Sequence, residues 1–197
     1  MEQKVSNFNI ANALTVIRIV LVPFFIWTLI AGIGTYKEFR WLPFLIFITA
    51  AITDKIDGDI ARARNLITDF GKIADPIADK ALLGGALIAL SYLNEIPWWI
   101  TIVILIREIG ITLLRFVVIK YQVVPASRGG KLKTVLQMIA LGMFIFPATA
   151  IFGQFGLILA WIVLIAATIV TVATGLDYVK QMVELIQEQK RKEPARK

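Results

Sequence analysis

Hydrophobic residues fill long stretches of this chain, and short polar intervals separate the stretches. About 20 predominantly apolar residues are needed for a helix to cross a bilayer. Six stretches approach or exceed that length, and they predict helices at residues 10–33, 41 to beyond 54, 72–93, 98–121, 134–151 and 157–179. The expected loops are residues 32–40, 62–70, 91–97, 122–133 and 153–156. The pattern predicts an all-α integral membrane protein with six transmembrane helices.

The composition supports one membrane domain over residues 1–197, because 58% of the residues are hydrophobic and the mean hydropathy is +0.76. These values exclude an ordinary soluble domain. The sequence has no cysteine and no histidine, which excludes disulfides and thiolate metal sites and leaves carboxylates as the expected proton acceptors. Residues 180–197 form a charged tail that is expected to begin as an amphipathic continuation of the last helix.

The net charge of +7 predicts contact with anionic membrane lipids and phosphate-bearing substrates, and no nucleic acid is expected as a partner. Lysine and arginine concentrate in the tail and around the second and fourth loops, and Lys4 lies near the amino terminus, whereas Lys37 and Arg40 are the basic residues of the first loop. The positive-inside rule therefore predicts a multi-pass protein of the cell membrane with both termini in the cytoplasm.

Carboxylates are concentrated at the junction of the second and third predicted helices. Asp54 and Asp57 are three residues apart, and Asp75 and Asp79 are four apart, so each pair lies on one helix face. Charge next to lipid is costly and marks functional sites. Convergent carboxylates bind hard divalent cations such as Mg²⁺ or Mn²⁺, and paired ions suit phosphoryl chemistry. A metal site is therefore predicted at the cytoplasmic edge of the bilayer.

A structural interpretation of the same stretch remains open. The aspartates could cap helices and form ion pairs with basic neighbours, namely Lys55, Arg62, Arg64 and Lys72. That interpretation accounts for the charge, but it does not account for the ordered glycines and the alanine between the aspartates.

The stretch reads D-x-x-D-G-x-x-A-R and, after eight residues, G-x-x-x-D-x-x-x-D, which resembles the signature of the CDP-alcohol phosphotransferase family. The resemblance implies a donor such as CDP-diacylglycerol, release of CMP and a homodimer. It further implies two bound Mg²⁺ or Mn²⁺ ions, with Asp79 also acting as the general base. The implied metal ligands are Asp54, Asp57, Asp75 and Asp79.

The residues expected to bind CDP-diacylglycerol come from the first three helices. Gly58 and Ala61 match positions where the cytidylyl group approaches the backbone, and Arg62 would meet the diphosphate. On the first helix, three polar residues spaced three apart are interpreted as a wall beside the carboxylates, although an arginine that snorkels from a helix start is an equal alternative. The full expected set is Asn12, Thr15, Arg18, Gly58, Ala61, Arg62 and Gly71.

The fourth predicted helix carries charges within an apolar segment. Glu108, Thr112 and Arg115 share one face, with Arg107 beside them. An ion pair that joins two helices is one interpretation. An anion pocket is the other, because two guanidinium groups and one carboxylate leave excess positive charge for a phosphate.

The segments around Asn12, Arg107 and Gly130 resemble the corresponding stretches of bacterial phosphatidylglycerophosphate synthases within that family. The resemblance covers nearly the whole chain apart from the tail. It implies sn-glycerol 3-phosphate as the acceptor. The candidates for holding its phosphate are Arg107, Arg115, Lys131 and Lys133.

Three other functions compete with this one. The first is the same reaction with another acceptor, such as inositol phosphate. The second, a membrane prenyltransferase, fits neither the chain length nor the D-G-x-x-A-R element. The third is a transporter for a divalent cation or an organic anion, which would place charges near the bilayer centre and show repeat symmetry. No repeat is found in the sequence.

Overall fold

The computed structural model describes residues 10–35, 40–63, 68–118, 128–146 and 148–192. These ranges contain six α-helices and no strand. The side chains of some residues near helix ends fall outside this description. The predicted all-α fold class is confirmed.

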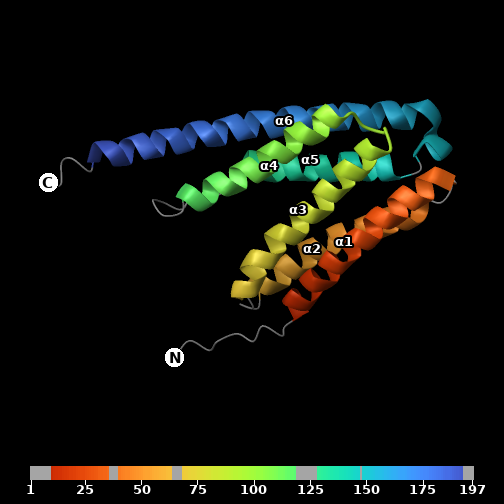
Figure 1. Ribbon diagram of the computed structural model, residues 1–197, viewed down its shortest axis with the longest axis horizontal. Helices are drawn as coiled ribbons and strands as arrows, with labels where there is room; N and C mark the ends of the chain where they lie inside the picture. Colours follow the sequence, from red (N-terminus) through yellow and green to blue (C-terminus); the bar gives the residue numbers. More distant parts are fainter. Residues whose placement is uncertain (1–9, 36–39, 64–67, 119–127, 147, 193–197) are drawn as a thin grey trace.

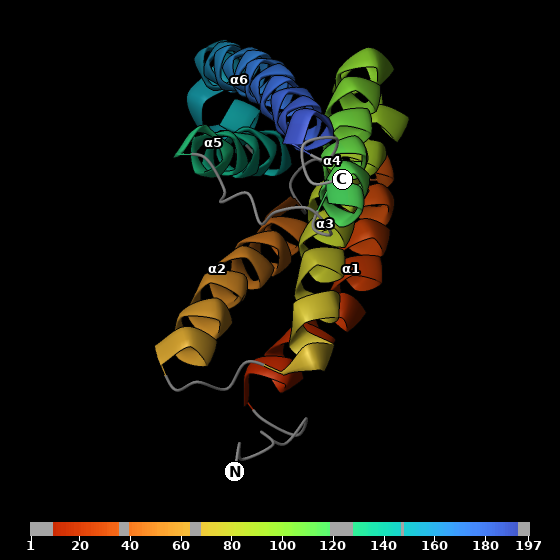
Figure 2. The same ribbon diagram turned by 90° about the vertical axis from the view of Figure 1, so that its left-hand side faces the viewer.

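The first three helices pack against one another. They are α1 (Ile10–Thr35), α2 (Trp41–Ala63) and α3 (Asp69–Tyr92). They alternate in direction, so the start of α1, the end of α2 and the start of α3 lie together at one end (Figures 1 and 2). The two halves of the aspartate signature lie on α2 and α3, and the fold brings both halves to that end.

The other three helices form a second group, in which α6 packs against both α4 and α5. This group consists of α4 (Trp98–Val118), α5 (Arg128–Ile145) and α6 (Ala148–Lys192). It lies at an angle across the first group (Figure 1). Helix α3 contacts α1 and α2 in its own group and α4 and α5 in the other, so it connects the two.

Two neighbouring glycines allow α3 to approach a helix on each side. A Cβ atom at Gly85 would lie 2.7 Å from Ile26 Cδ1 of α1, and one at Gly84 would lie 3.3 Å from Leu105 Cδ2 of α4. Small residues at helix contacts let backbones come close. Around this contact the apolar core includes Phe25, Phe47, Leu87, Leu90, Ile100, Ile104 and Leu141.

Helix α3 begins at Asp69 rather than near residue 72 because Thr68 caps its first turn. Thr68 has an extended backbone, and its Oγ1 atom accepts a hydrogen bond from the backbone N–H of Gly71 at 3.1 Å. A hydroxyl at this position satisfies one of the amides that a helix start leaves without a carbonyl partner.

The predicted loop at residues 122–133 is wrong over its last part, because α5 begins at Arg128. Helix α5 also ends at Ile145, before residue 151, where the fifth helix was expected to end. The prediction followed hydropathy, which does not mark a polar first turn as helical. Lysine and arginine are nevertheless good helix formers. Lys133 is buried, whereas its neighbours Leu132 and Thr134 are exposed.

The predicted turn at residues 153–156 is confirmed at Gly153, where a kink separates two helical parts of α6, but residues 154–156 are helical. Within α6 only Gly153 leaves the helical conformation, with φ +57°, a value that glycine adopts without steric cost. The helix then continues to Lys192, which confirms the predicted helical start of the tail. Close to the start of this extension, Tyr178 and Met182 of α6 pack against Ile111 and Leu114 of α4.

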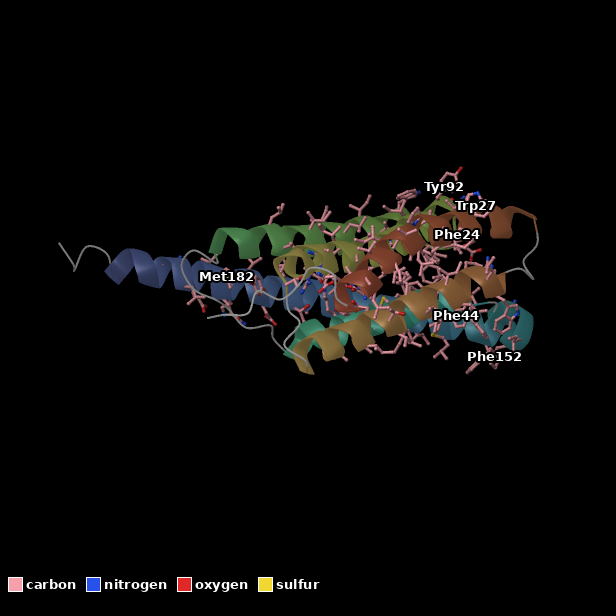
Figure 3. The ribbon with its side chains drawn as sticks, turned by 90° about the horizontal axis from the view of Figure 1, so that it is seen from below. Phe24, Trp27, Phe44, Tyr92, Phe152 and Met182 are labelled. Atoms are coloured by element: carbon pink, nitrogen blue, oxygen red, sulfur yellow. The ribbon has the colours of Figure 1, made fainter. Side chains whose placement is uncertain are left out.

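Aromatic side chains collect at the end opposite the aspartate signature. Figure 3 shows Phe24, Trp27, Phe44, Tyr92 and Phe152 toward one end of the molecule and Met182 toward the other. Among them, tryptophan and tyrosine are the residue types that are enriched where a membrane meets water. This end therefore has the character of a membrane interface.

Within the part of the chain that the structure describes, two helical segments are long and apolar enough to cross a membrane, Asn12–Ala31 and Ile151–Leu185. Large apolar side chains are also exposed on every described helix, for example Val20, Leu45 and Ile106. A soluble monomer rarely exposes apolar surface on this scale. These features are consistent with a membrane protein.

Arg40 ties three segments together at the aromatic end. Its guanidinium forms an ion pair with Glu95 in the turn before α4 and donates a hydrogen bond to the backbone oxygen of Phe144 in α5 at 3.2 Å. Arg40 is buried. Buried charges are stable in proteins only when they are paired in this way.

Replacing this arginine, Arg40→Ala, is expected to lower the free energy of unfolding by about 2 kcal/mol, because Glu95 and the Phe144 carbonyl lose a charged donor. For a chain of this size the melting temperature should fall by roughly 4–8 °C. Thermal unfolding in detergent measures the change, and Lys180→Ala, at an exposed position on α6, is the control. Equal melting temperatures for the two variants would contradict the account.

Candidate active site

The polar residues at the start of α1 face the protein interior. Asn12, Thr15 and Arg18 are 5%, 1% and 1% exposed. Their spacing of three residues places them along one side of the helix. The structure therefore does not support an arginine that snorkels to the surface, and it favours a polar wall inside the molecule.

Arg18 joins the two halves of the signature. Its Nη1 atom lies 2.5 Å from Asp54 Oδ1 of α2 and 3.2 Å from Asp79 Oδ1 of α3. Both carboxylates are partly exposed, whereas the guanidinium is buried beneath them. One nitrogen atom thus forms ion pairs with carboxylates from two helices and keeps them close together.

The other two polar residues of α1 contact the start of α3. Thr15 donates a hydrogen bond from Oγ1 to Asp75 Oδ1 at 2.6 Å. Thr68 donates from Oγ1 to Asn12 Oδ1 at 2.9 Å. A Cβ atom at Gly71 would lie 3.0 Å from that same Asn12 oxygen, so a glycine fits this contact best. The structure brings the predicted residues of α1 and α3 into direct contact.

The residues at this end suit a divalent cation in their chemistry. Carboxylate oxygens are hard ligands that Mg²⁺ and Mn²⁺ prefer, and the guanidinium between Asp54 and Asp79 shows that positive charge fits there. Among the side chains that the structure describes, no three carboxylates form a group that could hold a metal ion. The fourth predicted ligand, Asp57, lies outside that set, and the metal site stays a prediction.

Several predicted site residues are described by their backbone alone. Asp57, Gly58, Ala61 and Arg62 lie in the last two turns of α2, at the same end as the start of α3. Arg115 lies in α4 and Lys131 in α5, and neither side chain is described. Their predicted roles therefore rest on the sequence.

A second cluster of charged groups connects α4 with α5. Glu108 Oε1 accepts hydrogen bonds from Arg107 Nη1 at 3.3 Å and from the ammonium group of Lys133. The ion pair across two helices that the sequence suggested is present. It involves two cations and one carboxylate, so the cluster also keeps the excess positive charge that an anion pocket requires.

Lys80 is a residue of this region that the sequence interpretation did not include in the site. It follows Asp79 on α3, and its ammonium group donates a hydrogen bond to Thr112 Oγ1 of α4. Thr112 lies one turn after Glu108 and donates to the Glu108 backbone oxygen at 2.8 Å. We call Asp54, Asp75 and Asp79 the carboxylate cluster, and Arg107, Glu108 and Lys133 the cationic cluster. Helix α3 therefore contributes Asp79 to the carboxylate cluster, and through Lys80 it contacts α4, which carries part of the cationic cluster.

Thr68 was also missed, and a local signal could have identified it. A threonine at the end of a polar interval, followed by an aspartate and then by an apolar helical segment, is a typical helix start. The signal for Lys80 is weaker. It is only a lysine beside the last aspartate of the signature.

Comparison with known proteins identifies a family whose model covers the residues of both clusters. The family model for CDP-alcohol phosphatidyltransferases matches residues 8–173. A probable phosphatidylglycerophosphate synthase of Mycobacterium tuberculosis is 48% identical over 171 residues, which cover 87% of this chain and 80% of that protein.

Two further relatives are named CDP-diacylglycerol--glycerol-3-phosphate 3-phosphatidyltransferase. The Bacillus subtilis protein is 35% identical over 184 residues, covering 87% of this chain and 93% of the relative. The Rickettsia felis protein is 40% identical over 176 residues, covering 87% and 94%. The family match includes the whole aspartate signature and both charged clusters, and the chain belongs to the CDP-alcohol phosphatidyltransferase family.

Proposed function

We propose that this protein transfers the phosphatidyl group of CDP-diacylglycerol to sn-glycerol 3-phosphate, giving phosphatidylglycerophosphate and CMP. One observation carries the proposal: α3 contributes Asp79 to the carboxylate cluster and, through the next residue, Lys80, contacts the helix that carries Arg107 and Glu108 of the cationic cluster. A donor diphosphate and an acceptor phosphate can then be held on either side of one helix. The names of the relatives support this choice of substrates.

The donor would bind at the end where α1, α2 and α3 meet. Asn12, Thr15, Arg18 and Gly71 would line the site, together with Gly58, Ala61 and Arg62 of α2. Two Mg²⁺ or Mn²⁺ ions held by Asp54, Asp57, Asp75 and Asp79 would supply positive charge to the phosphoryl oxygens and to the departing CMP. The contact of Arg18 with Asp54 and Asp79 supports the convergence of these carboxylates.

The reaction is an in-line substitution at the phosphorus that carries the diacylglycerol. The acceptor hydroxyl oxygen forms a bond to that phosphorus. The bond from the phosphorus to the oxygen shared with CMP breaks, and CMP leaves with the electron pair. Asp79 accepts the hydroxyl proton, and the hydrogen bond from Arg18 holds its carboxylate in a fixed orientation.

The cationic cluster would orient the acceptor through its phosphate. Arg107 and Lys133 share the carboxylate of Glu108, which fixes both side chains before the acceptor arrives. Arg115 and Lys131 complete the proposed set. A free polyol would not need so many cations, because charged groups near a membrane are costly without an anion to bind.

The whole chain, residues 1–197, would form one domain with six membrane spans and both termini in the cytoplasm. The distribution of basic residues supports this orientation, with the active site at the cytoplasmic edge. The relatives from bacteria support a bacterial cell membrane as its location. A homodimer is included on the family resemblance alone.

The first test measures CMP release by purified protein in vesicles that contain CDP-diacylglycerol and Mg²⁺ or Mn²⁺, with each acceptor added separately. Release should depend on glycerol 3-phosphate, and Asp79→Asn should reduce the rate at least about 100-fold because the general base is lost. Asp177→Asn, at an exposed aspartate of α6, is the matched control.

Release with inositol phosphate instead would keep the reaction and replace the acceptor. Metal binding without release from any acceptor would favour the transporter. Full activity of Asp79→Asn would contradict the assignment of the base.

The acceptor site is tested by Lys133→Met, which keeps the length of the side chain and removes its charge. The KM for glycerol 3-phosphate should rise about tenfold or more, because a charge-assisted hydrogen bond to the phosphate is lost. The KM for CDP-diacylglycerol should stay the same. Steady-state kinetics with Lys180→Met as the exposed control measures both values, and equal increases in the two KM values would exclude a specific acceptor role.

A further inference from the structure

The side chain of Arg107 lies close to α6 at Gly175. The three heavy atoms closest to a Cβ atom built at Gly175 all belong to Arg107: Cγ at 3.0 Å, Nε at 3.4 Å and Cδ at 3.8 Å. A side chain at this position would therefore press on the stem of the arginine. Gly175 is buried within α6, where glycine costs about 1 kcal/mol of helix stability relative to alanine.

The residue before this glycine holds the end of the same arginine. Arg107 Nη2 donates a hydrogen bond to Thr174 Oγ1 at 3.2 Å. The threonine hydroxyl donates in turn to the backbone oxygen of Val170 at 2.7 Å. Because its proton is used within the helix, its lone pairs are available to accept from the guanidinium.

The guanidinium is consequently fixed by two helices. On α4 it donates from Nη1 to Glu108, and on α6 it donates from Nη2 to Thr174. A guanidinium has its donors in one rigid plane, so two fixed contacts determine the direction of the remaining N–H groups. Arginine binds a phosphate well only when this plane is correctly oriented.

We propose that Gly175 and Thr174 are positioning residues for the acceptor: they set the orientation in which Arg107 meets the phosphate of glycerol 3-phosphate. The inference rests on the proposed function, and it adds α6 to the acceptor site. The family match ends at residue 173, so neither residue lies within it.

The effect of a small displacement follows from the distances. The bonds from Arg107 to Glu108 and Thr174 are 3.3 and 3.2 Å long, near the upper limit for a hydrogen bond. A Cβ atom at residue 175 must move the arginine stem by a few tenths of an ångström to reach ordinary contact distance. The guanidinium would then leave the plane in which it binds a phosphate.

The test compares Gly175→Ala with Gly142→Ala, a glycine inside α5 whose added Cβ would make an ordinary contact of 3.7 Å with Phe47. In Gly175→Ala the KM for glycerol 3-phosphate should rise about tenfold. The KM for CDP-diacylglycerol and the melting temperature should stay close to those of Gly142→Ala. Equal values of all three quantities in the two variants would overturn the proposal, as would equal increases in both KM values.

A second pair of variants carries the test if Gly175→Ala does not fold. Thr174→Val keeps the shape and removes the acceptor oxygen, whereas Thr174→Ser keeps the hydroxyl. The KM for glycerol 3-phosphate should rise several-fold in the valine variant and return toward the wild-type value with serine. The same KM for valine and serine would overturn the proposal. Absence of glycerol 3-phosphate-dependent CMP release in the wild-type protein would instead be a failure of the proposed function.

Discussion

The ion pairs of Arg18 with Asp54 and Asp79 are the interaction on which the candidate site depends. Carboxylates beside apolar helices repel one another and are costly unless a cation lies between them. The guanidinium supplies that cation from α1, and it is 1% exposed. Helix α1 is thus both an apolar membrane segment and the support that holds the carboxylates of α2 and α3 together.

Helix α3 meets a second constraint, because it must contact different partners on its two sides. Two pairs of consecutive residues on α3 make these contacts with different helices. Gly84 and Gly85 allow close approach of α4 and α1, and Asp79 and Lys80 carry polar contacts to α1 and α4. The apolar packing and the polar contacts therefore follow the same arrangement, which fixes the distance between the carboxylate and cationic clusters.

The sequence predicted most of the fold because long apolar segments and basic intervals are direct consequences of a membrane environment. The start of α5 was missed because residues 128–133 are polar and helical at once, and hydropathy cannot distinguish such a turn from a loop. The aspartate signature located the carboxylates. The contacts of Arg107 with Thr174 and Gly175 depend on how α4 lies against α6, which no local pattern in the sequence reveals.

Binding of Mn²⁺ to the purified protein in detergent, followed by electron paramagnetic resonance, tests the central claim most directly. Up to two ions should bind per chain. Asp54→Asn and Asp79→Asn should each weaken binding, whereas the exposed-site variant Asp177→Asn should not. Unchanged Mn²⁺ binding in the two signature variants would show that the carboxylates of α2 and α3 do not form one cation site.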